Sequence, residues 1–292
     1  MEAALAARTL VSAWTAARMR LEAAGVDSPV INARLLVEAA ASSSRTELIS
    51  DPHRLLTSAQ GDKLEAMLAR REKREPMSHI LGRKGFWKLM LAVTPDVLTP
   101  RPETETILDV VLAKFDPDSR FCVLDLGIGS GALLLTILTE RPRACGLGVD
   151  ISEKALAVAA MNAAALGLAS RIALVRGDWT SGLASNCFDL VVCNPPYIPT
   201  EDIAGLAPEV RDHEPRVAID GGRGGLVAYR LLAGEILRVL RPGGAFALEI
   251  GREQREPVER LAQAAGAVEL AVIRDLAGRE RVVWGAKKAL GE

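Results

Sequence analysis

The chain has 292 residues, of which 49 % are hydrophobic and 25 % are charged, and its formal net charge is −1. This composition is typical of a globular protein with room for one large and one small domain, whose core needs neither disulfides nor metals. The balanced charge excludes a global attraction to nucleic acid or to an anionic membrane.

Targeting and metal-binding signals are not found. The amino terminus has acidic Glu2 and no apolar region before Trp14, which is unlike a secretory signal. The histidines show no ligand spacing, so we expect no metal site. Cys122 and Cys145 lie in apolar runs and are predicted to be small buried hydrophobic residues. These features fit a reducing compartment, and we expect a cytoplasmic protein without membrane contact.

Residues 1–75 are predicted to form a small domain of helices only. The first helix carries apolar residues at helical spacing, namely Leu10, Trp14 and Leu21, and ends at Gly25. The second is predicted to begin at Ser28-Pro29, with Ser28 as its cap. A capping box, Thr57 to Gln60, opens the third. This helix ends in residues 70–75, whose charges alternate, which indicates a solvated helix end rather than a nucleic-acid patch.

A short linker follows. Residues 76–98 contain a β-like stretch with Phe86 and Trp87, and they are predicted to form a hairpin between two domains. Pro100-Arg101-Pro102 then interrupts regular structure, and residues 103–115 are predicted to form a helix with acidic residues in its first turn.

Residues 99–292 are predicted to form the larger domain, of the α/β class. Apolar runs of strand length lie at 121–126, 144–149, 172–175, 188–193 and 245–250. They alternate with helical stretches near 131–140, 152–166 and 226–240, which predicts a parallel sheet with helices on both faces. The last two strands, 269–274 and 279–284, are so close that they must form an antiparallel hairpin. A parallel sheet that ends in an antiparallel hairpin resembles the Rossmann-like sheet of class I methyltransferases.

A glycine-rich turn follows the first strand of this domain. Gly127-Ile128-Gly129-Ser130-Gly131 lies between a strand and a helix, where glycines let the backbone approach a ligand. Asp150 ends the next strand, where a carboxylate can accept hydrogen bonds from both ribose hydroxyls of a nucleoside. Trp179 follows the third strand and offers an aromatic face for an adenine, although a core tryptophan is also possible. An NAD enzyme and a methyltransferase both fit these residues.

The fourth strand distinguishes the two, because it runs directly into Asn194-Pro195-Pro196-Tyr197. An amide nitrogen is a poor nucleophile, since its lone pair is delocalised into the carbonyl group. The Asn194 side-chain oxygen and the Pro195 carbonyl can accept both N–H groups of such an amide and stabilise its developing positive charge. Tyr197 can pack on the planar acceptor, and the prolines stiffen the loop. The tetrapeptide therefore predicts methyl transfer to a planar amide-type nitrogen.

With these residues in place, the chain resembles the release-factor glutamine N5-methyltransferases, the HemK-type family, over nearly its whole length. The resemblance includes residues 76–82, Phe86-Trp87, Pro100 to Glu105, the glycine turn, Asp150, Trp179, residues 194–197, Glu214-Pro215, Gly221-Gly222 and residues 249–251. It implies methylation of the glutamine in the Gly-Gly-Gln motif of class-I peptide-chain release factors, with S-adenosylmethionine as donor. It also implies that the helical domain helps to bind the protein substrate, and we expect a monomer without direct nucleic-acid contact.

The resemblance carries roles onto particular residues. Donor contacts are expected from Gly127, Ile128, Gly129, Ser130, Gly131, Asp150, Trp179 and Asn194. Substrate contacts are expected from Asn194, Pro195, Pro196 and Tyr197, of which Asn194, Pro195 and Tyr197 are the catalytic candidates. Ile128, Thr99 and His213 depart from the family pattern, and the last leaves the substrate-side loop less defined.

Three other functions remain open at this point. An adenine-N6 methyltransferase acting on DNA or RNA can use the same tetrapeptide, but it needs a basic groove that the balanced charge does not favour. A sister enzyme that modifies a ribosomal-protein glutamine is disfavoured by the stretch from Pro100 to Glu105. A non-enzymatic nucleotide-binding module would explain the glycine turn but leave residues 194–197 without a purpose.

Overall fold

The computed structural model describes residues 8–291. It divides the chain into two compact units: one runs to Gly82 and includes Ala207–His213, and the other comprises Arg83–Leu206 and the chain from Glu214 onward. The sequence-based boundaries, after residues 75 and 98, thus differ from this division, and segment 207–213 was not expected in the helical unit. The predicted lack of a secretory signal rests partly on residues outside the described range.

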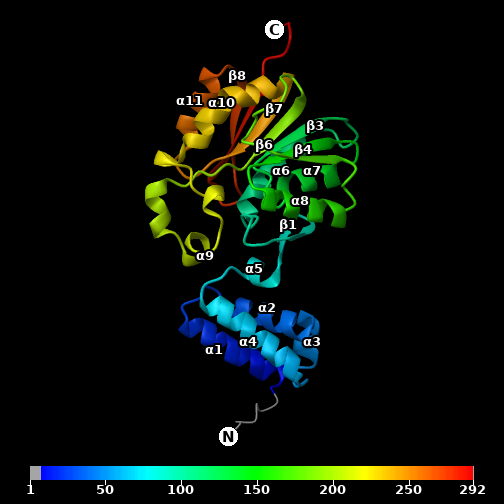
Figure 1. The fold of residues 1–292 in the computed structure, drawn as a ribbon, viewed down its shortest axis with the longest axis vertical. Coiled ribbons are helices and arrows are strands. Elements are labelled where there is room, and N and C mark those ends of the chain that lie inside the picture. Colours follow the sequence, from blue (N-terminus) through cyan, green and yellow to red (C-terminus); the bar gives the residue numbers. More distant parts are fainter. Residues whose placement is uncertain (1–7, 292) are drawn as a thin grey trace. The chain divides into compact units, whose positions relative to one another are not determined.

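The first unit is helical, as its hydrophobic spacing predicts (Figure 1). Its helices are α1 (Leu10–Ala23), α2 (Pro29–Ala41), α3 (Arg45–Ser50), α4 (Ser58–Glu72), α5 (Met77–Leu81) and, from the later segment, α9 (Pro208–Arg211). The capping box before α4 is confirmed, because Thr57 accepts a hydrogen bond from the Gln60 N–H. Ser28 precedes α2 but adopts a left-handed conformation, so the prediction that its side chain caps the helix is wrong.

The charged end of α4 is solvated only in part: Arg70 and Lys73 are exposed, as predicted, but Arg71 is not. Arg71 is buried, because it follows Leu64 and Leu68 on the inward face of the helix. Its guanidinium donates to Asn32 Oδ1 at 2.8 Å and to Glu209 Oε1 at 2.9 Å. Arg74 donates to both carboxylate oxygens of Glu209. The two arginines lower the pKa of Glu209 to about 2 against the effect of its burial. These ion pairs tie segment 207–213 to the helices.

The second unit begins with the antiparallel hairpin of β1 (Arg83–Phe86) and β2 (Leu89–Ala92). The hairpin is shorter than the predicted linker, because residues 77–81 form α5. A short 3₁₀ helix, Pro102–Thr104, leads directly into α6 (Glu105–Lys114).

The sheet of the second unit confirms the predicted α/β class. Its strand order is β5-β4-β3-β6-β7-β9-β8. The strands are β3 (Cys122–Leu126), β4 (Cys145–Asp150), β5 (Ile172–Arg176), β6 (Phe188–Cys193), β7 (Leu240–Glu249), β8 (Ala267–Arg274) and β9 (Glu280–Lys287). The first five are parallel, and β9 pairs antiparallel with both β7 and β8. The strand order therefore reverses between β3 and β6, where doubly wound sheets bind their ligands.

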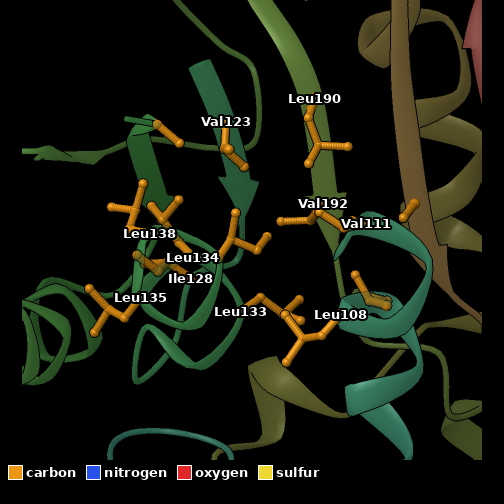
Figure 2. Close-up of a cluster of buried hydrophobic side chains, with 14 of the residues drawn as sticks. Leu108, Val111, Val123, Ile128, Leu133, Leu134, Leu135, Leu138, Leu190 and Val192 are labelled. Atoms are coloured by element: carbon orange, nitrogen blue, oxygen red, sulfur yellow. The ribbon is translucent and has the colours of Figure 1, made fainter. Parts of the chain in front are cut away.

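Helices cover both faces of this sheet (Figure 1). On one face α6, α7 (Ala132–Glu140) and α8 (Glu153–Ala165) pack against alternate residues of the central strands. Figure 2 shows this core, in which Val123 of β3 and Leu190 and Val192 of β6 face the leucines of α7. On the other face α10 (Val227–Val239) and α11 (Arg255–Ala264) cover the intervening residues. Both faces are apolar, as a buried parallel sheet requires.

Two further expectations concern cysteines and membranes. Cys122 is half-buried, but Cys145 is exposed, so the prediction that both are buried is wrong. Each is the first residue of its strand, and the two are paired across β3 and β4 with their Sγ atoms 3.3 Å apart. Within residues 8–291, no helix has the length and apolar character that crossing a membrane requires.

Candidate active site

A cavity of about 600 Å³ opens at the carboxyl ends of β3, β4 and β6 in the second unit. The volume lies in the range of sites for drug-sized ligands and cofactors. Of the predicted site residues, those in its wall are Gly127, Ile128, Gly129, Ser130, Asp150, Trp179, Asn194 and Pro196. The sheet thus brings most of the predicted donor residues to one edge. The described wall does not include Gly131, Pro195 or Tyr197.

Asp150 is oriented by backbone groups on both sides. The Gly129 N–H donates to Oδ2 and the Ser152 N–H donates to Oδ1, each at 2.9 Å. An ionised carboxylate has about four acceptor positions, so two remain for a ligand after these bonds. Asp150 is therefore held in place and still able to accept hydrogen bonds from a diol.

The glycine turn is shaped by its neighbours. Gly131 has a φ of 85° and directly precedes α7, where a Cβ would lie 2.7 Å from Leu135 Cδ1. Its requirement for glycine is therefore steric, and the residue faces the helix rather than the cavity. The Ile128 side chain is buried against Gly148, and its backbone N–H donates to the Val149 carbonyl, so this residue fixes the turn to β4.

Trp179 and Asp125 complete the donor side of the cavity. A Cβ on Gly127 would lie 3.8 Å from Trp179 Cζ3, so the indole ring lies beside the glycine turn. Asp125, at 2 % exposure, lies in the same wall and accepts a hydrogen bond from the Leu134 N–H at the start of α7. Burial, together with the nearby Asp150 charge, raises the pKa of Asp125 to about 7. A cation bound in the cavity would stabilise this carboxylate, and the Asp125 position was missed by the sequence analysis.

Two side chains of the tetrapeptide Asn194-Pro195-Pro196-Tyr197 are hydrogen-bonded to residues from other parts of the second unit. The Asn194 Nδ2 group donates to Thr104 Oγ1 at 3.1 Å. The Tyr197 hydroxyl donates to Glu249 Oε1 at 3.2 Å, and burial raises the pKa of Tyr197 above its usual value. The tyrosine ring therefore lies behind the loop, where it fixes the loop rather than forming part of the cavity wall.

The chain after Tyr197 passes through closely packed backbone. Gln254 Nε2 donates to the carbonyl oxygens of Tyr197 and Gly225, and Gln254 Oε1 accepts from the Gly251 N–H. A Cβ on Gly225 would lie only 2.1 Å from the Tyr197 carbonyl oxygen. We call the residues Tyr197, Gly225, Gly251 and Gln254 the loop clamp.

Side-chain hydrogen bonds connect the cavity wall to other parts of the second unit. Arg101, in the wall, donates to Glu214 Oε2 at 2.7 Å, and this bond joins the Pro-Arg-Pro stretch to the chain after the tetrapeptide. Asn162 of α8 bonds to both backbone groups of Ala92 and to the Ser130 carbonyl, so it links the hairpin to the glycine turn. His213 lies in the first unit, where its ring pairs with the Lys73 carbonyl. No cluster of metal-binding side chains occurs in the described part of the chain.

Both units of the chain resemble known proteins. Residues 12–82 match the family model described as the PrmC N-terminal domain, and residues 117–278 match a methyltransferase domain. A release factor glutamine methyltransferase of Caulobacter vibrioides is 59 % identical over 97 % of this chain and 98 % of its own length. The chain belongs to the release factor glutamine methyltransferase family. The enzyme is thus an S-adenosylmethionine-dependent methyltransferase, as its sequence predicts.

Further relatives agree with this assignment. A Rhodospirillum rubrum protein of the same name is 44 % identical over 93 % of this chain and 83 % of its own length. Among solved structures, a methyltransferase from Pyrococcus furiosus has a TM-score of 0.50 at 17 % identity, covering 68 % of this chain and 88 % of its own. The hMettl16 catalytic domain, solved with an RNA hairpin, has a TM-score of 0.54 at 13 % identity, covering 84 % and 86 %. These two structures support the fold alone.

The buried Asp125 gives a prediction for the pH dependence of stability. A folded-state pKa raised to about 7 means that the native state keeps a proton that the unfolded state releases near its ordinary value of 3.8. The raised pKa therefore stabilises the folded protein fully below about pH 4, and this contribution is lost as the pH rises through about 7. The total change in the free energy of unfolding is on the order of 2–4 kcal/mol. Urea unfolding at pH 5 and pH 8 should therefore show a smaller pH effect for Asp125→Asn than for wild type. If the free energy of unfolding changed equally with pH in both proteins, the raised pKa of Asp125 would be contradicted.

Proposed function

We propose that the enzyme transfers a methyl group from S-adenosylmethionine to the side-chain nitrogen, N5, of the glutamine in the Gly-Gly-Gln motif of class-I release factors. The observation that carries the proposal is the position of Asn194 and Pro196 in the wall of the same cavity as Asp150 and Trp179. The names of the relatives support the choice of substrate. Such a partner is consistent with a cytoplasmic reaction.

The donor side of the cavity suits this cofactor. The two acceptor positions that remain on Asp150 suit ribose hydroxyls, and the Trp179 ring suits an adenine. Asp125 adds a carboxylate that gains from a nearby cation, because its pKa is raised by burial. When bound, S-adenosylmethionine supplies a methyl group on a positively charged sulfur.

The acceptor side suits a planar amide. Because Nδ2 of Asn194 is engaged by Thr104, Oδ1 is the end of this side chain that can accept a hydrogen bond from the substrate. With the Pro195 carbonyl it would accept both N–H groups of the glutamine and hold the lone pair toward the methyl carbon. As the N–C bond forms, the S–C bond to the methyl group would break with its electron pair on sulfur, so the positive charge would pass from sulfur to nitrogen, and the nitrogen would then lose a proton to solvent. No general base is needed before transfer.

Asp150→Ala is expected to weaken binding of S-adenosylmethionine by about one to two decades. The loss of hydrogen bonds to a charged group costs roughly 1.5–3 kcal/mol. Isothermal titration calorimetry measures this directly. Glu153→Ala is the matched control, because Glu153 also lies near the end of β4 but its side chain is 84 % exposed. Equal affinities for wild type and Asp150→Ala would contradict the ribose contact.

A single labelling experiment tests the proposed function. The enzyme is mixed with methyl-labelled S-adenosylmethionine and, in separate reactions, with a class-I release factor, a release factor with Gln→Ala in its Gly-Gly-Gln motif, ribosomal proteins and DNA. We expect label only in the unaltered release factor, on the glutamine nitrogen by mass spectrometry. Label in DNA or in a ribosomal protein, and none in the release factor, would overturn the proposal.

We also propose that the helical unit binds the release factor. The cavity lies within the second unit, and no residue of its described wall belongs to the helical unit. Deletion of residues 1–82 should therefore leave donor affinity within about threefold of wild type. Methylation of a whole release factor should fall at least about tenfold in kcat/KM, because contact area is lost. Circular dichroism checks that the shortened protein is folded. An unchanged kcat/KM would argue against a docking role.

A further inference from the structure

The orientation of the Asn194 amide depends on a residue outside the tetrapeptide. A side-chain amide has a donor end and an acceptor end, and only the acceptor end can hold a substrate N–H. Thr104 is 5 % exposed and accepts a hydrogen bond from the donor end of Asn194 at 3.1 Å. We propose that Thr104 is a positioning residue that fixes which end of Asn194 faces the acceptor nitrogen, an inference that rests on the proposed function.

Glu249 lies near this contact. Its carboxylate is 1 % exposed, and burial raises the pKa of Glu249 to about 7, while the nearby Thr104 hydroxyl shifts this pKa in the opposite direction. A hydroxyl has one hydrogen to donate, and its oxygen can accept. The Thr104 oxygen accepts from Asn194 Nδ2, which leaves Asn194 Oδ1 as the end of the amide that can accept a substrate N–H.

The Glu249 carboxylate holds the other end of the tetrapeptide. Tyr197 donates to Glu249 Oε1, whereas Asn194 is held by Thr104. Of these residues, Asn194 follows β6, Thr104 precedes α6 and Glu249 ends β7. All three elements pack into the core of the second unit, so the acceptor geometry is set by rigid parts of the fold.

The first test compares two substitutions of Thr104. Thr104→Val keeps the branched shape without the hydroxyl, whereas Thr104→Ser keeps the hydroxyl. We expect the single-turnover rate of methyl transfer to fall about 10- to 100-fold in Thr104→Val and less than about threefold in Thr104→Ser, with donor affinity unchanged in both. Thr136→Val is the control, because Thr136 is also buried but its hydroxyl donates within its own helix, α7, to the Ala132 carbonyl. Equal rates in the valine and serine variants would overturn the inference.

The second test reads the amide itself and needs no substrate. The chain has four asparagines, Asn32, Asn162, Asn186 and Asn194, so a spectrum of protein labelled with ¹⁵N-asparagine is simple to assign. The Asn194 signal is the one missing in Asn194→Asp. We expect its hydrogen exchange to accelerate at least tenfold in Thr104→Val, while Asn162 of α8, bonded to Ser130, does not change.

The two tests separate the inference from the proposed function. If wild type methylates no release factor and the Asn194 signal still responds to Thr104→Val, the proposed function is wrong and the positioning contact stands. If wild type is active, but neither the rate nor the Asn194 exchange changes in Thr104→Val, the contact has no role and the inference is wrong.

Discussion

Asn194→Ala is expected to lower the single-turnover rate of methyl transfer about 10²–10³-fold, which is typical when one preorganised polar group is removed from an active site. The variant removes the side-chain oxygen that would orient the glutamine nitrogen and leaves the Pro195 carbonyl alone. Asn194 follows β6 and is only partly buried. The melting temperature should therefore move by no more than a few degrees, about the effect of one hydrogen bond. Rapid quench with a purified release factor measures the rate.

Asn194→Asp is the sharper variant of the same experiment. It keeps the shape and an acceptor oxygen, but it has no N–H group to donate to Thr104 Oγ1. We expect a rate nearly as low as that of Asn194→Ala. Rates like those of wild type in both variants would mean that the tetrapeptide is structural and that the proposed mechanism is wrong.

Gly225→Ala is expected to have the second largest effect, on stability and activity together. The left-handed φ of 69° disfavours any side chain, and a Cβ would overlap the Tyr197 carbonyl oxygen that accepts from Gln254. Backbone strain and steric overlap together should lower the free energy of unfolding by roughly 2–5 kcal/mol, and the residues of the loop clamp must move apart to relieve them. We expect a melting temperature lower by about 5–15 °C and a methyl-transfer rate lower by at least tenfold.

Gly224→Ala is the control for this prediction. Gly224 has nearly the same φ, 66°, but nothing lies within 4 Å of the Cβ that would be added. It therefore carries the backbone strain without the overlap, and the cost should be about 1–2 kcal/mol. Differential scanning calorimetry and the transfer assay compare the two. If both variants lost stability and activity equally, close contact with Tyr197 would not be what matters at Gly225.

Sequence periodicity was sufficient to predict the second unit. Strand and helix alternation, the antiparallel end and most of the predicted donor residues are local patterns, and Asp150 ends its strand as expected. The contacts that fix the site are not local. Asn194 and Thr104 are 90 positions apart, and a buried threonine has no pattern that distinguishes it from other threonines. Gln254 likewise follows a recognised motif, but only the folded chain shows that it bonds to Tyr197.

The helical unit was predicted less well, for a related reason. Alternating charges usually indicate solvent exposure, but the spacing from Leu64 to Arg71 places this arginine on the inner face. Its partner, Glu209, is 138 positions away, so no window of sequence contains both. The exposure of Cys145 was not predicted, because apolar neighbours in the sequence do not show that a residue is the first of its strand.

The insertion of residues 207–213 into the first unit has a consequence for protein synthesis. The helices α1 to α5 leave the ribosome early, with their apolar core complete but with Arg71 and Arg74 still without the Glu209 carboxylate. A buried guanidinium that lacks its carboxylate is costly, so the nascent helical unit should be least stable until residue 209 has emerged. The amino-terminal unit thus reaches its full stability only after β3 to β6 have also been translated.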